Sequence, residues 1–178
     1  MNVRKLRGLR WVRRFNFHQC INYESVAEHS FFVAMIVGYL SDWDMEAVDA
    51  ALFHDVEESV TGDIPFLIKK ELDTEEVERS ARNELGIARE KILFPADRIL
   101  VELADVVETK IYLEEERKAG NQNLFDIEME TIDRMWLLLK EIGDPIITRK
   151  VKDMISMVPC RPTPGTFLTH EGEQWKSQ

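Results

Sequence analysis

Apolar residues recur at helical spacing along most of the chain, and no segment alternates apolar and polar positions as a half-buried strand does. Helices are expected at residues 6–14, 26–40, 44–60, 73–86, 95–119, 124–142 and 145–158. Ser25 with Glu28 forms a capping-box pattern, and Asp44 and Pro95 suit helix starts. The sequence therefore predicts an all-α fold, a single compact bundle of about six to seven helices with short loops.

The sequence predicts one domain followed by a C-terminal tail. Its 178 residues are enough for one hydrophobic core, and no linker or repeat interrupts residues 1–158. The proline-rich stretch 159–178 is expected to be loosely structured. The longest apolar run, 31–40, is too short to span a bilayer. No secretory signal is visible, and two cysteines are too few for a disulfide framework, so a cytoplasmic protein is expected.

Charge is unevenly distributed along the chain. The net charge is −10, yet the first 23 residues carry six lysines and arginines and no acid. An acidic body disfavours a nucleic-acid polymer, because binding one requires many phosphates to be neutralised. A basic arm still suits one small phosphorylated ligand. We therefore expect a small-molecule partner and neither a nucleic-acid polymer nor a membrane.

Four polar residues lie on helices whose inner sides are otherwise apolar: His29, His54, Asp55 and Asp105. A lone histidine or aspartate on a helix is more often a hydrogen-bonded core residue or a solvated one. Three antiparallel helices of a bundle, however, can bring all four side chains to one point. Two imidazoles and two carboxylates would hold a metal and leave coordination positions free for water and substrate. Their joint occurrence favours a metal site.

Three acidic residues follow the His-Asp pair. Glu58 is one helical turn beyond His54 and shares its face, so it can take a proton from water at the metal. Glu57 points about 100° away on a helix, which favours a solvated side chain. Asp63 is close enough to reach the same cavity, and a turn or capping role is equally open.

At these residues the chain resembles the HD-domain metal-dependent phosphohydrolase superfamily, in its 5′-deoxynucleotidase branch. The matching segments are Arg14-Phe15, AEHS at 27–30, HDVEESVTGDIP at 54–65, Lys69 and LAD at 103–105. They occur in the family's order and at similar spacing over about residues 10–125. The resemblance implies an HD-type enzyme of deoxynucleotide metabolism.

The resemblance also implies roles for individual residues. The metal ligands would be His29, His54, Asp55 and Asp105. Glu58 would handle the proton of the attacking water, and Asp63 would orient substrate or water. Arg14 would bind the substrate phosphate, because a guanidinium fork suits phosphate oxygens. Lys69 would add a second cation. The cofactor would be one divalent transition metal, since this ligand set accepts Zn, Co, Mn, Ni or Fe. Homodimers or larger homo-oligomers are expected.

The chain departs from the family pattern at Phe15. Those deoxynucleotidases commonly carry tryptophan there, where it crowds the 2′ position of the sugar. Phenylalanine is smaller and lacks the indole N–H, so Phe15 is a substrate-binding candidate whose discrimination against ribose is open.

Several functions remain open at this point. The first is removal of the 5′-phosphate from (deoxy)nucleoside monophosphates, giving nucleoside and inorganic phosphate. Phage enzymes that the chain also resembles release tripolyphosphate from dATP, so a dATP triphosphohydrolase is the alternative. A non-catalytic nucleotide-binding module is the third, which an intact ligand set with Glu58 disfavours. A (p)ppGpp hydrolase is weaker, because the TGDIP context fits it less well.

Overall fold

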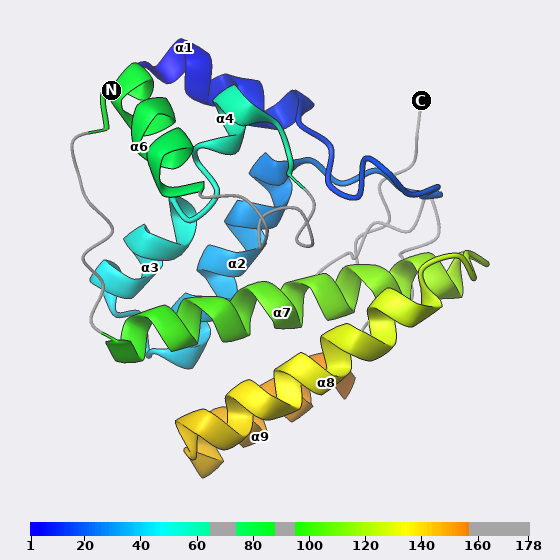
Figure 1. Cartoon of the computed structure of the whole chain (residues 1–178). Helices are drawn as coiled ribbons and strands as arrows, with labels where there is room; N and C mark the ends of the chain where they lie inside the picture. The colour runs from blue at the N-terminus through cyan, green and yellow to red at the C-terminus, as the bar shows by residue number, and fades with distance from the viewer. Residues whose placement is uncertain (65–73, 88–94, 157–178) are drawn as a thin grey trace, which may run out of the picture.

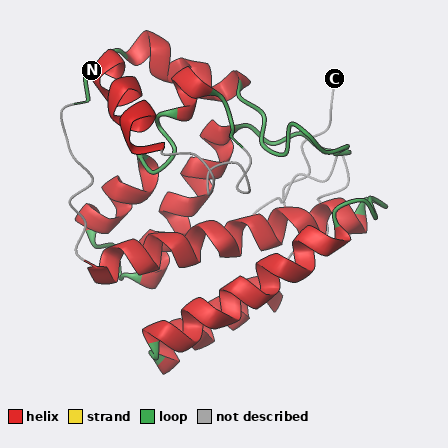
Figure 2. Ribbon diagram, in the orientation of Figure 1, coloured by secondary structure: helices red, strands yellow, loops and turns green. Residues whose placement is uncertain are grey.

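The computed structural model describes residues 1–64, 74–87 and 95–156, and within them the chain is helical (Figure 1, Figure 2). The described helices are α1 (Val3–Leu6), the 3-10 helix η1 (Arg7–Trp11), α2 (Val26–Leu40), α3 (Met45–Leu52), α4 (Glu58–Thr61), α6 (Thr74–Leu85), α7 (Pro95–Lys118), α8 (Phe125–Ile142) and α9 (Pro145–Ser156). The only β-type pairing in this part of the chain is one isolated bridge, between Arg13 and Ser25. The all-α fold class is confirmed.

Helix α7 is the centre of the arrangement. It packs along α8 on one side and against α2 and α3 on the other, and α9 also contacts it (Figure 1). The main core contains Val33 and Val37 of α2, Ala104 and Val107 of α7, and Leu138 of α8, all without exposed surface. Burying a valine or leucine side chain of this kind contributes about 1.5–3 kcal/mol. The core therefore fixes α2 and α7 against each other.

The caps explain why most helix bounds follow the sequence. Ser25 Oγ accepts a hydrogen bond from the Glu28 N–H at 3.2 Å, and the Glu28 carboxylate accepts one from the Ser25 N–H at 2.8 Å. The capping box is thus confirmed, and α2 begins at Val26 as expected. The Asp44 side chain caps α3 by accepting from the Glu46 N–H. These signals act over a few residues, so sequence alone locates them.

Two expected helices differ in the structure. The segment 44–60 is divided into α3 and α4, with Phe53–Glu57 in turns between them. The segment 6–14 is replaced by α1 and η1, which end before Val12. These divisions give eight α-helices in the described residues, one more than expected.

One large apolar side chain of α8, Trp136, is only partly buried. Its neighbours Met135 and Leu139 are buried, but Trp136 is 43% exposed, and the Lys152 ammonium lies 5.6 Å from its ring centroid. The proposed domain limits at 158 and 159 stay predictions, because the tail lies outside the described residues.

The basic N-terminal segment is held beside the start of α2. The Arg14 N–H donates to the Glu24 carbonyl at 3.1 Å, and the Val26 N–H donates to the Val12 carbonyl at 2.9 Å. These two bonds close the loop between residues 14 and 24. The side chain of Arg14 is thereby placed next to the first turn of α2.

Candidate active site

His29 enters the core because of the capping box before it. The box fixes the first turn of α2, and the imidazole in that turn points inward with no exposed surface. Nε2 of His29 lies 3.1 Å from Asp105 Oδ1, and Nδ1 lies 2.5 Å from Glu108 Oε2. Asp105 and Glu108 are one turn apart on α7. Two carboxylates from one helix thus contact the two nitrogens of one buried ring.

His54 and Asp55 follow α3 in a turn, so the prediction that they lie on a helix is wrong. Nδ1 of His54 lies 2.6 Å from the Ala51 carbonyl oxygen, which as an acceptor requires a proton on that nitrogen. Nε2 is left facing its neighbours, 3.2 Å from Asp55 Oδ2 and 3.3 Å from Nε2 of His29. The turn therefore aims imidazole and carboxylate at the same point.

The structure brings the four expected metal ligands together. Single ligand atoms of His29, His54 and Asp105 lie within 4.8 Å of one another, and Asp55 Oδ2 is 3.8 Å from Nε2 of His29. Their side-chain exposure is graded: 0% for His29, 12% for His54, 23% for Asp55 and 38% for Asp105. Two nitrogens and two carboxylate oxygens suit a divalent transition metal. The donor set fits that group.

The electrostatics of the cluster also favour a cation. Burial and the Arg14 charge lower the pKa of His29, but the hydrogen bonds that its ring donates to Asp105 and Glu108 outweigh them and raise it to about 9. Burial likewise opposes the charged form of His54, while the charge of Asp55 raises its pKa. The pKa of Asp105 is lowered against its burial, mainly by its hydrogen bond with His29. A positive charge is stabilised at this point.

Glu58 and Glu57 are both buried. Glu58 begins α4, directly after the turn that carries His54 and Asp55. The expectation that Glu57 is solvated is wrong, because its carboxylate forms an ion pair with Arg82 of α6. Arg82 also donates to the Phe53 carbonyl at 3.3 Å, so it holds both ends of the turn.

The other expected site residues differ in how well they are defined. Asp63 is half-buried, and its carbonyl accepts a hydrogen bond from the Asn16 side chain at 3.1 Å. Phe15 has a φ of 54° and stacks on Tyr112 with ring centroids 5.3 Å apart. Lys69 lies outside the described residues, so its proposed role stays a prediction.

Arg14 lies beside the cluster and is engaged by acidic partners. Its Nη1 donates to Glu24 at 2.8 Å and to Glu108 at 3.0 Å, and its Nη2 donates to Thr109 at 2.8 Å. Nη2 is also 3.8 Å from Asp105 Oδ1. The guanidinium therefore adjoins the candidate metal ligands, and Nη1 has both of its N–H groups bonded.

Glu24 and Glu108 were not singled out from the sequence. Glu108 follows Asp105 by three residues, a spacing that places both on one helical face and was visible in the chain. Glu24 gives no such signal, because it reaches Arg14 through the loop closure before α2. Only the folded arrangement shows its part in the network.

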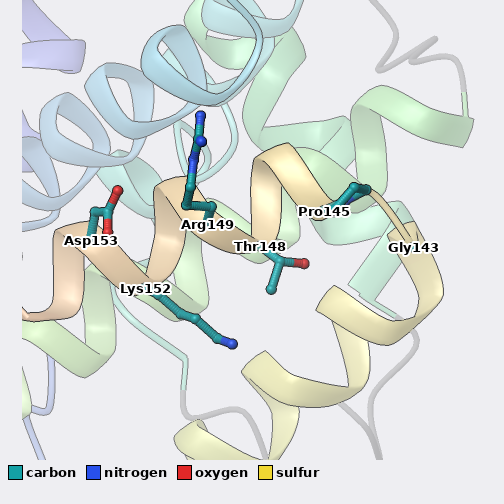
Figure 3. Close-up of a pocket in the computed structure, with 6 residues that line it drawn as sticks. All are labelled: Gly143, Pro145, Thr148, Arg149, Lys152 and Asp153. Carbon is teal, nitrogen blue, oxygen red and sulfur yellow. The ribbon is translucent and has the colours of Figure 1, made fainter.

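Two hollows lie outside the four-residue cluster. One of about 360 Å³ is lined by residues of α2 and α7, including Phe32 and Glu108, together with Glu24 before α2 and Met154 of α9. Another of about 570 Å³ lies at the junction of α8 and α9, lined by Arg149, Lys152 and their neighbours (Figure 3). Neither is lined by a ligand of the cluster.

A family model described as 5′-deoxynucleotidase YfbR-like matches residues 3–144. The chain belongs to this family. As a YfbR-like protein it is a metal-dependent nucleotide phosphohydrolase of the HD type. None of the described helices combines the length and the apolar content that a membrane span needs.

Solved structures share the fold of this YfbR-like chain. A conserved hypothetical protein from Pyrococcus furiosus is 26% identical, with a TM-score of 0.64 over 88% of this chain and 96% of that one. The cyanophage S-2L HD phosphohydrolase DatZ, bound to dA and one catalytic Zn²⁺ ion, is 18% identical, with a TM-score of 0.66 over 88% and 95%. PH0347 of Pyrococcus horikoshii OT3 is 24% identical, with a TM-score of 0.63 over 88% and 95%. A comparison with curated proteins gives no match.

Proposed function

We propose that the protein removes the 5′-phosphate from (deoxy)nucleoside monophosphates, giving a nucleoside and inorganic phosphate. The family match supports this substrate class. The observation that carries the proposal is the convergence of His29, His54 and Asp105, with Asp55 3.2 Å from His54 and the Arg14 guanidinium 3.8 Å from Asp105. A metal cluster beside a guanidinium suits a phosphate ester, whose oxygens need both kinds of positive charge.

The metal would be held by His29, His54, Asp55 and Asp105. A divalent transition metal supplies Lewis acidity there, which polarises a phosphoryl oxygen and lowers the pKa of water. The ligand set accepts Zn, Co, Mn, Ni or Fe. Zn²⁺ has additional support from the DatZ structure, which is described as holding one catalytic Zn²⁺ ion.

Glu58 is the proposed general base. It accepts a proton from the water whose oxygen attacks phosphorus, while the bond between phosphorus and the 5′ oxygen breaks. The leaving 5′ oxygen takes up a proton to complete the nucleoside. Arg14 neutralises charge on the non-bridging phosphate oxygens, and Lys69 would add a second cation. Asp63 is proposed to orient water or substrate.

The second candidate is hydrolysis of a deoxynucleoside triphosphate, dATP above all, to deoxynucleoside and tripolyphosphate. The likeness of fold to DatZ, which is described as bound to dA, favours it. The two candidate reactions use the same site and differ in whether the substrate carries one phosphate or three.

For either reaction we also propose a homodimer or larger homo-oligomer, because α2 exposes Phe31, Phe32 and Tyr39.

The experiment that separates the candidates is product analysis. The metal-loaded protein is incubated with panels of dNMP, NMP and dNTP in the presence of Co²⁺ or Mn²⁺. Inorganic phosphate and nucleoside from monophosphates support the proposal, whereas tripolyphosphate from a dNTP supports the second candidate. Asp105→Asn should be inactive on every substrate. If no panel is turned over with any metal while nucleotides still bind, the protein is a non-catalytic binding module.

A further inference from the structure

The nitrogen of His29 that faces away from the cluster has a carboxylate partner of its own. Nδ1 lies 2.5 Å from Glu108 Oε2, and both side chains are buried, with 0% of His29 and 5% of Glu108 exposed. Arg14 Nη1 also donates to Glu108 Oε2 at 3.0 Å, and a carboxylate held by a guanidinium is the charged, accepting partner. Nδ1–H of His29 is the donor.

Glu24, His29 and Glu108 form a second group of side chains whose ligand atoms lie within 4.8 Å of one another. This group already holds a cation of the protein's own. Nη1 of Arg14 donates to Glu24 at 2.8 Å and to Glu108 at 3.0 Å. A guanidinium does not lose its proton in a protein, so one permanent positive charge lies between the two carboxylates. The group is therefore suited to orienting His29, since both of its carboxylates already contact a cation of the protein.

The geometry also fixes the angle of the ring. Asp105 and Glu108 lie one turn apart on α7 and contact opposite nitrogens of the His29 ring. Ala104 and Val107, which directly precede the two acids, are fully buried in the core and hold this part of α7 in place. Rotation of the ring would break one contact or the other.

We propose that Glu108 is a positioning residue for the metal site. By accepting the proton of His29 Nδ1, it leaves Nε2 as the nitrogen that a metal can take, aimed at the point that Asp105 and His54 also face. Arg14 and Glu24 hold Glu108 in that position. The inference rests on the proposed metal-dependent function, and it gives Arg14 a second role besides its proposed contact with phosphate. A carboxylate that accepts a hydrogen bond from a metal-binding histidine raises the basicity of that histidine and determines which ring nitrogen carries the proton.

The test is Co²⁺ affinity, measured by spectroscopic titration of the metal-free protein. Glu108→Gln should weaken binding by about tenfold to a hundredfold, the usual effect of losing such a partner. Glu24→Gln is the matched control, because Glu24 bonds the same guanidinium but acts on His29 only through Glu108, so it should weaken binding much less. Unchanged Co²⁺ affinity in folded Glu108→Gln, or equal losses in both variants, would overturn the proposal.

A second measurement needs no variant. Histidine nitrogen NMR of the Zn²⁺-loaded wild type should show a proton on Nδ1 of His29 and Zn²⁺ on Nε2. Zn²⁺ on Nδ1 would overturn the proposal, since Glu108 would then be a ligand itself. Neither readout depends on turnover. A protein that binds metal in this way yet hydrolyses no nucleotide would refute the proposed function and leave the positioning role intact.

Discussion

Both imidazoles of the cluster have their Nδ1 atoms engaged elsewhere. Nδ1 of His54 bonds the Ala51 carbonyl and Nδ1 of His29 bonds Glu108, so both Nε2 atoms face the same point, 3.3 Å apart. Fixing one nitrogen of a histidine determines which nitrogen is available to a metal. At the scale of single residues, the site is thus defined by hydrogen bonds as much as by the ligands.

The base assignment can be tested at Glu58. Glu58→Gln should lower kcat by about 10²–10⁴, because an amide cannot accept the proton of the attacking water. Co²⁺ affinity should stay close to that of the wild type, since Glu58 is not a proposed ligand. Steady-state kinetics and metal titration check both.

Glu57→Gln is the control for Glu58. It is an adjacent buried acid, and its partner is Arg82, so this variant should lose stability and keep turnover. If Glu58→Gln kept the kcat of the wild type, Glu58 would not be the general base.

Discrimination against ribose can be tested at Phe15. Phe15→Trp should raise the ratio of kcat/KM for dNMP over NMP by about tenfold, because a larger ring leaves less room for a 2′ hydroxyl. Phe17→Trp is the control, since Phe17 is 73% exposed. Equal ratios in both variants would show that position 15 does not contact the sugar.

At the scale of elements, the sequence predicted α2, α7 and α8 closely, because caps, prolines and apolar periodicity act locally. It did not predict the turn at His54-Asp55. That turn interrupts a continuous apolar pattern and is held by Arg82, which bonds Glu57 and the Phe53 carbonyl from a distant helix. Glu24 was missed for the same reason. Tertiary contacts of this kind leave no mark in a short window of sequence.

Helix α7 also anchors the loop that follows Arg14. The fully buried carboxylate of Glu116 accepts hydrogen bonds from the N–H groups of Ile21 and Asn22 at 2.7 and 2.6 Å, and from the Asn121 side chain at 2.8 Å. Glu116→Gln should lower the free energy of unfolding by about 2–4 kcal/mol, because an amide N–H₂ would face N–H donors. Urea unfolding near neutral pH measures this loss.

The pH dependence of that loss follows from the pKa of Glu116. Burial raises this pKa, but the hydrogen bonds from Asn121, Ile21 and Asn22 outweigh it and hold the value below the ordinary 4.5. A lowered folded-state pKa gives stability that is complete above the unfolded value and lost as pH falls through the folded one. The difference between wild type and Glu116→Gln should therefore be constant above about pH 5 and shrink below about pH 4. If the stability difference between wild type and Glu116→Gln instead grew as pH fell, the Glu116 carboxylate would not be its source.

At the scale of the whole molecule, the candidate ligands come from α2, the turn after α3, and α7. Each supplies one or two donors, so the cluster exists only when these elements are packed together. Metal binding should consequently stabilise the folded chain and not the unfolded one.

Metal removal should thus lower the melting temperature. At a free metal concentration of about 100 Kd the stabilisation is about 2.7 kcal/mol, or about 5–10 °C for a domain of this size. Calorimetry of chelated and Co²⁺-reloaded protein measures the shift, and Asp105→Asn should abolish it. An equal shift in that variant would mean that the ion binds elsewhere.

The four side chains differ in exposure: His29 has no solvent-exposed side-chain surface, while Asp55 and Asp105 are 23% and 38% exposed. We therefore expect the ion and the nucleotide to reach the cluster from the side of the two carboxylates. A nucleotide bound there would cover the ion, which should then exchange with a chelator more slowly than in the protein without nucleotide.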